Sequence, residues 1–77
     1  MNRVMRLAEL MPGQAGRVVY LTGGYGFMRR LTDMGLTPGV LVRVLKNDVG
    51  PIVVEVRGIR LALGRGVASR ILVEPIG

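Results

Sequence analysis

The side chains that most often perform catalysis are absent or isolated in this sequence of 77 residues. There is no histidine and no cysteine, so the commonest general base and the thiol nucleophile are both missing. Ser69 is the single serine and has no histidine to activate it. Paired carboxylates are not expected either, because the five acidic residues fall in different parts of the chain: Glu9, Asp33, Asp48, Glu55 and Glu74. We therefore expect a binding protein that is not an enzyme and has no cofactor.

Metal binding is also disfavoured by the residue types. Structural zinc sites use cysteine and histidine, and iron sites usually add nitrogen or sulfur donors to carboxylates. This chain offers only oxygen donors and the thioethers of five methionines, which do not cluster. Met28 and Met34 are interpreted as helix-packing residues. We predict no metal site.

A glycine-rich stretch, Gly23-Gly24-Tyr25-Gly26, precedes a predicted helix that carries Arg29 and Arg30. The amides at a helix N-terminus can hold a phosphate. Neither the G-x-G-x-x-G pattern nor a P-loop lysine is present, however. A simple turn is the favoured interpretation.

Eleven basic and five acidic residues give the chain a net charge of +6. Such a charge favours a nucleic acid, an anionic membrane surface or an acidic protein as partner, or it keeps an apolar domain in solution. The basic residues are scattered, which favours solubility, and nucleic-acid binding is the alternative. Few aromatic side chains, Tyr20, Tyr25 and Phe27, are present for base stacking. No apolar run approaches the roughly 20 residues that span a bilayer, so we expect a cytoplasmic protein, peripheral to the membrane at most.

Twelve glycines and four prolines separate short β-branched runs, a rhythm typical of a small barrel. The only convincing helix covers residues 27–34, with Phe27, Leu31 and Met34 on one face and Gly35 as its C-terminal cap. Residues 64–70 form a turn or a single helical turn. The sequence predicts one mainly β domain over residues 1–77, a small barrel of about five strands with one short helix. The expected strands are 17–22, 40–46, 51–57, 60–63 and 71–74.

Strand alternation predicts which apolar side chains face outward. The expected inward set is Val18, Tyr20, Ile52, Val54, Val56, Ile71 and Val73. The expected outward set is Val19, Leu21, Val53 and Leu72, with Leu41 and Leu45. Coverage by the helix or the N-terminal segment is one explanation for this outward set, and a protein interface is the other. The candidate partner-binding residues are Leu21, Tyr25, Arg29, Arg30 and Val53, and on this view Leu21→Asp or Val53→Asp leaves the fold intact while abolishing binding.

Three stretches resemble the ferrous-iron transport protein A (FeoA) family. They are LAELMPGQAG at residues 7–16, RLTDMGLTPG at 30–39 and LALGRGVASRILV at 61–73. The second matches an R-L-x-x-M-G-L-x-x-G pattern. The three stretches follow the family's order, and the similarity covers nearly the whole chain.

This resemblance implies an SH3-like barrel that acts as a cytoplasmic accessory to FeoB, a membrane iron transporter with a GTP-binding cytoplasmic domain. Members of the family are expected to modulate uptake by that transporter. A similar fold forms the C-terminal domain of iron-dependent repressors of the diphtheria-toxin-repressor type, but these 77 residues include no DNA-binding helical domain, and we expect the free-standing form. The family's motifs carry no catalytic residues. Metal-binding roles proposed for some relatives are not expected in this chain, because it lacks histidine and cysteine.

Overall fold

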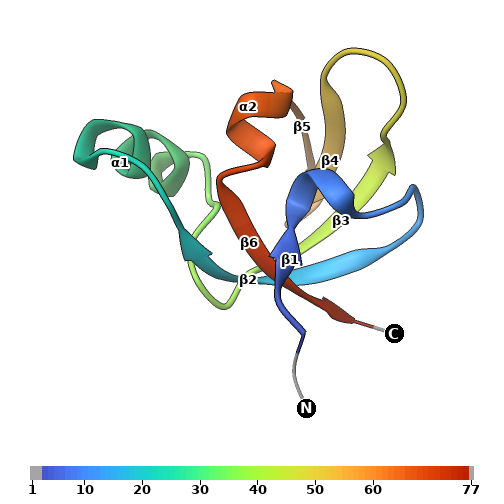
Figure 1. Ribbon diagram of the computed structural model, residues 1–77, viewed down its shortest axis with the longest axis horizontal. Coiled ribbons are helices and arrows are strands. Elements are labelled where there is room, and N and C mark those ends of the chain that lie inside the picture. The colour runs from blue at the N-terminus through green and yellow to red at the C-terminus, as the bar shows by residue number, and fades with distance from the viewer. Residues whose placement is uncertain (1–2, 77) are drawn as a thin grey trace.

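Six antiparallel strands of one strongly bent sheet form the body of the molecule in a computed structural model that describes residues 3–76 (Figure 1). The strand order across the sheet is β1-β6-β2-β3-β4-β5. The strands are β1 Met5–Arg6, β2 Ala15–Leu21, β3 Leu41–Lys46, β4 Ile52–Val56, β5 Ile59–Leu63 and β6 Ile71–Ile76. The prediction of a small, mainly β barrel is confirmed, with one strand more than expected. The additional strand, β1, has two residues and is too short to show alternation.

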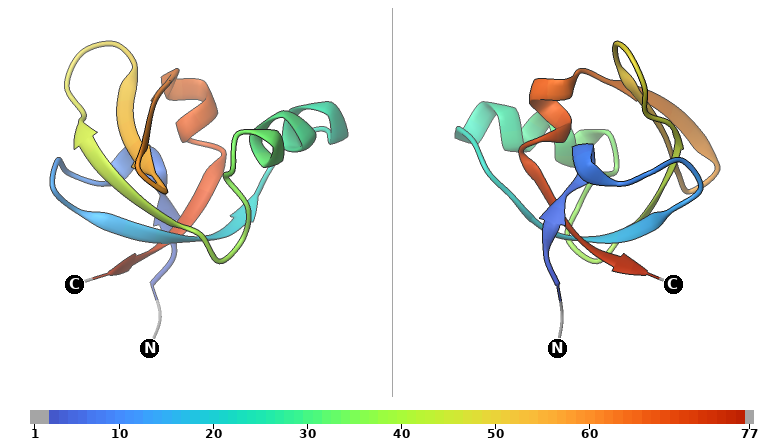
Figure 2. Two further views of the ribbon diagram at one scale, coloured as in Figure 1. Left: turned by 180° about the vertical axis from the view of Figure 1, so that it is seen from behind. Right: turned by 45° about the vertical axis from the view of Figure 1, so that its right-hand side comes forward.

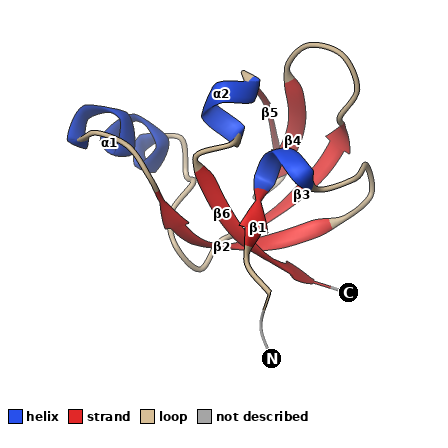
Figure 3. Cartoon of the chain, viewed as in Figure 1, coloured by secondary structure: helices blue, strands red, loops and turns tan. Residues whose placement is uncertain are grey.

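Three helical segments connect the strands (Figure 3). They are the 3₁₀ turn η1 Leu7–Glu9, the helix α1 Tyr25–Asp33 and the single turn α2 Arg65–Ala68. The predicted helix is confirmed, although it begins two residues earlier than expected. Gly35 follows it at φ +91°, the left-handed conformation that favours glycine after a helix.

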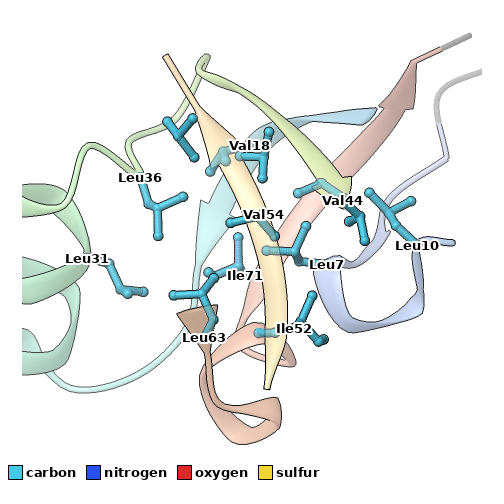
Figure 4. Close-up of a cluster of buried hydrophobic side chains, with 14 of the residues drawn as sticks. Leu7, Leu10, Val18, Leu31, Leu36, Val44, Ile52, Val54, Leu63 and Ile71 are labelled. Carbon is cyan, nitrogen blue, oxygen red and sulfur yellow. The ribbon is translucent and has the colours of Figure 1, made fainter. Parts of the chain in front are cut away.

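The hydrophobic core occupies the interior of the bent sheet (Figure 4). Residues from outside the long strands cover its two ends. Val54 and Ile71 lie in the middle, on the faces that alternation predicts. Leu7 and Leu10 from the N-terminal segment close one end, and both are fully buried. Leu31 of α1 and Leu36, which follows that helix, close the other.

The side chain of Asn47 holds the N-terminal segment in place. Its Nδ2 donates to the carbonyl of Ala8 at 3.0 Å and to that of Leu10 at 2.7 Å. Arg65 of α2 donates to Oδ1 of Asn47 at 2.8 Å and also to the carbonyl of Asp48. The β3–β4 loop, α2 and the N-terminal segment are therefore joined through one amide side chain.

Two arginines on the outer face of the sheet stabilise turns. Arg43 of β3 donates from Nη1 to the carbonyl of Gly13 at 2.9 Å, and Arg17 of β2 donates from Nη1 to that of Gly39 at 3.0 Å. Each arginine thus binds the Pro-Gly turn that precedes the neighbouring strand. Part of the basic charge has a structural role.

The predicted orientations of Tyr20 and Leu21 are wrong. Tyr20 is 56% exposed, whereas Leu21 is 6% exposed and belongs to the core. The register between β2 and β6 shifts between Val18 and Tyr20, so Val19 is an extra residue that reverses the alternation after it. Val19 and Leu41 do face outward as predicted, while Leu45, Val53 and Leu72 are half-buried.

The bulge predicts that truncating Val19 and Leu21 lowers the free energy of unfolding by unequal amounts. Without the bulge, these two residues would lie on the same face of β2. Leu21→Ala should lower the free energy of unfolding by about 2–5 kcal/mol, because it leaves a cavity in the core. That loss is comparable with the roughly 3–5 kcal/mol that a core of this size supplies. Val19→Ala, at an exposed position, should change it by less than about 1 kcal/mol. Urea unfolding followed by far-UV circular dichroism measures both, and equal costs would contradict the bulge.

Candidate protein-docking site

Helix α1 projects from one side of the barrel, which the front and rear views both show (Figures 1 and 2). It leaves the end of β2 and returns to β3 through the segment that contains Leu36. Leu31 is its buried residue, and Leu36, whose amide donates to the carbonyl of Leu31 at 2.9 Å, is fully buried in the core of the barrel. At the other end, the amide of Thr22 donates to the carbonyl of Arg70 at 2.9 Å. Both ends of the projecting element are thus attached to the barrel.

Gly23 permits close packing where α1 joins the barrel. Its φ is +139°, and an added Cβ would lie 2.6 Å from Cδ2 of Phe27. The Phe27 ring packs against the core, and the guanidinium carbon of Arg70 lies 5.2 Å from the ring centroid, in the range of a cation–π interaction. Gly23 therefore serves the turn and the placement of Phe27, whereas Tyr25 and Gly26 of the glycine-rich stretch belong to α1.

The outer face of α1 exposes side chains of the kinds common in protein interfaces. Tyr25 is 82% exposed and Met28 is 37% exposed. Together with Arg29, Thr32 and Asp33 they line a shallow depression of about 420 Å³. Tyrosine, methionine and arginine are enriched in protein interfaces, so this face has the composition of a docking surface.

The inner face of α1 borders a smaller hollow that it shares with the edge of the sheet. The volume of this hollow is about 190 Å³. It is lined by Phe27, Arg30, Leu31, Met34, Ala62, Leu63, Gly64 and Val67. Except for Arg30, the side chains that line this hollow are apolar.

The structure separates the predicted contact residues into three groups. Tyr25 and Arg29 lie together on the outer face of α1, whereas Arg30 lines the inner hollow. Val53 is half-buried on β4 and pairs with Ala62, another residue of that hollow. Leu21 belongs to the core, so its predicted place on the surface is wrong, and Leu21→Asp would unfold the protein rather than test binding.

The interpretation of Met28 and Met34 as helix-packing residues is also wrong in part. Met28 is 37% exposed on the outer face, and Met34 is 41% exposed beside the inner hollow. Met28 lies three residues after Tyr25, a spacing that puts two side chains on the same face of a helix. That spacing was the signal for its place in the site.

Within residues 3–76, no three carboxylates come together where they could hold a metal ion. In the same part of the chain, no helix has the length and apolar character needed to cross a membrane.

Comparison with known proteins identifies the family. The family model described as FeoA domain matches residues 5–75. The chain belongs to the FeoA domain family. A protein of Methanocaldococcus jannaschii named "Putative Fe(2+) transport protein A" is 37% identical over 68 residues, which cover 88% of this chain and 83% of that protein.

Solved structures agree with this assignment. The crystal structure of an "Iron Uptake Regulatory Protein (FeoA)" is 41% identical to this FeoA-family chain, with a TM-score of 0.91 and coverage of 96% of this chain and 100% of the other. A manganese-dependent transcriptional repressor superimposes with a TM-score of 0.88 over 99% of this chain and 44% of the repressor, at 22% identity. The second likeness concerns the fold alone. The predicted SH3-like barrel is confirmed.

The attachment of α1 predicts opposite effects of alanine at two glycines of the same stretch. Gly23→Ala should lower the free energy of unfolding by about 1–3 kcal/mol through backbone strain. Displacement of the Phe27 ring by the new Cβ should lower it further. Gly26→Ala should raise it by about 0.5–1 kcal/mol, because Gly26 lies in the helix and an added Cβ meets no atom within 4 Å. Urea unfolding of the two variants distinguishes them, and a neutral Gly23→Ala would refute the close packing.

Proposed function

We propose that this protein is a small accessory of ferrous-iron transport that binds the cytoplasmic part of a FeoB-type membrane transporter and modulates its uptake activity. The supporting observation is a projecting helix in a FeoA-family chain whose outer face exposes Tyr25, Met28 and Arg29. The proposal accounts for a surface that the barrel does not use for its own stability.

The composition of this face suits a compact binding contact. Tyrosine and arginine are over-represented among residues whose truncation costs the most binding energy. Tyr25 exposes most of its surface at the first position of α1, and Arg29 lies one helical turn further on. Because Leu31 and Phe27 fix the helix on the barrel, little ordering of the backbone is needed on binding, and less binding energy is lost.

The net charge of +6 supports a partner with an acidic surface. Complementary charge speeds association and selects partners. Close to an anionic membrane, each basic residue near the surface adds about 1 kcal/mol of attraction. Both effects would concentrate the protein where a membrane transporter presents its cytoplasmic part.

The test is the affinity of the full chain for the purified transporter of the source organism, measured in detergent by biolayer interferometry. Tyr25→Ala and Arg29→Glu should each weaken binding by about 30-fold, the effect of losing roughly 2 kcal/mol at a contact hot spot. Val49→Ala and Lys46→Glu are the matched controls, since both residues are exposed on the β3 strand or the loop that follows it. They should change the affinity by less than about threefold.

Two results would refute this proposal. In the first, the wild-type chain fails to bind the transporter at moderate salt. In the second, the immobilised chain retains only RNA or DNA from an extract and releases it as the salt concentration rises. Loss of binding with salt is typical of contacts to the phosphate backbone and would make nucleic-acid binding the function.

A further inference from the structure

Among the strands of residues 3–76, β5 lies at one edge of the sheet and pairs only with β4. The two strands are joined by the two-residue turn Arg57-Gly58, in which both residues have positive φ, 52° and 82°. In such a hairpin the flanking pair, here Val56 and Ile59, exchanges both hydrogen bonds, and bonded pairs then alternate along the ladder. Leu61 and Leu63 therefore bond to β4 as well.

The same alternation directs the backbone N–H and C=O groups of Arg60 and Ala62 away from β4. Within residues 3–76, no strand pairs with that side of β5, and no backbone hydrogen bond to another element involves either residue. Both residues are exposed, and Ile59 beside them is 63% exposed. Such a row of unpaired groups is a template for another extended chain.

A chain that lay along this edge would pass the hollow between β5 and α1. Ala62 and Leu63 of β5 line it on one side, and Phe27, Leu31 and Met34 line it on the other. Its volume of about 190 Å³ is below the roughly 300–1,000 Å³ of pockets that take small molecules. The hollow is of a size for one large side chain of a bound peptide.

The charges near the edge favour an acidic occupant over a second copy of this chain. Arg30 lines the hollow, and Arg60 lies on the edge strand itself. Antiparallel pairing of two β5 strands would bring two copies of Arg60 close together and would join two chains of net charge +6, which is unfavourable. An acidic segment at the same edge would instead be attracted by Arg30 and Arg60.

From these observations we infer that an extended, acidic segment of the transporter's cytoplasmic part adds to the free edge of β5 and inserts one large apolar side chain into the hollow beside α1. Its main chain bonds to the backbone of Arg60 and Ala62, and Arg30 contacts its carboxylates. The identity of this partner rests on the proposed function. Strand addition itself rests on the edge and the hollow.

The first experiment selects short random peptides on the full chain by phage display and measures their affinity by fluorescence anisotropy. Selected peptides should combine a large apolar residue with acidic residues. Ala62→Pro removes an N–H that does not bond to β4, a substitution that edge strands tolerate, and should weaken peptide binding at least tenfold. Ala62→Ser keeps the N–H and serves as its control, with an expected change below threefold.

Two further measurements keep the test decisive if Ala62→Pro fails to fold. The amides of Arg60 and Ala62 should exchange with deuterium at least tenfold more slowly in the peptide complex. Arg30→Glu should weaken binding at least tenfold, whereas Lys46→Glu, the same charge change outside the hollow, should alter it less than threefold. Unchanged exchange together with full binding by Arg30→Glu would overturn strand addition. So would a concentration-dependent dimer that Ala62→Pro abolishes, since the edge would then belong to a second copy.

The second experiment measures transporter binding with the same variants. If Ala62→Pro and Arg30→Glu weaken it as they weaken peptide binding, the inference holds in full. If Tyr25→Ala abolishes transporter binding and Ala62→Pro does not affect it, the proposed function is supported. The same result would overturn the inference of strand addition at β5. Peptide binding at the edge without any transporter binding would instead refute the proposed function and retain strand addition.

Discussion

The apolar interior of a small bent sheet is open at its two ends, and closing those ends is the constraint on which the rest of this structure depends. Strand residues such as Val54 and Ile71 fill the middle, but the ends are closed by Leu7 and Leu10 on one side and by Leu31 and Leu36 on the other. A chain of 77 residues without cysteine or histidine has no disulfide or zinc site to replace that burial.

The segments that close the ends of the core also determine which surfaces are exposed. The N-terminal segment is held over its end by the amide of Asn47. Helix α1 contributes Leu31 and Phe27 to the other end and is left with an outer face that no other part of residues 3–76 covers. Closure of the core thus presents a rigid, exposed helix, and the candidate site is a consequence of how the barrel is completed.

The two candidate surfaces lie on opposite sides of α1. Tyr25 and Arg29 face outward, whereas Arg30 and Met34 face the hollow beside β5. Adjacent arginines therefore belong to different environments, because successive residues of a helix point about 100° apart. A partner could contact both sides of α1 at once. It would bind Tyr25 and Arg29 on the outer face and would add a strand to β5 on the other side.

The sequence by itself determined the fold class, the helix α1, its glycine cap and the inward faces of β4 and β6, because period-two alternation and glycine conformation are local properties. It also gave Tyr25 and Arg29 as candidate contact residues, and the structure exposes both on one face of α1. Only the tertiary structure decided that Leu21 is buried and Tyr20 exposed, since the bulge at Val19 arises from pairing with β6. Likewise, the juxtaposition of Arg30 with Ala62 depends on how α1 packs on the barrel. Such contacts join residues far apart in the chain, and no local pattern encodes them.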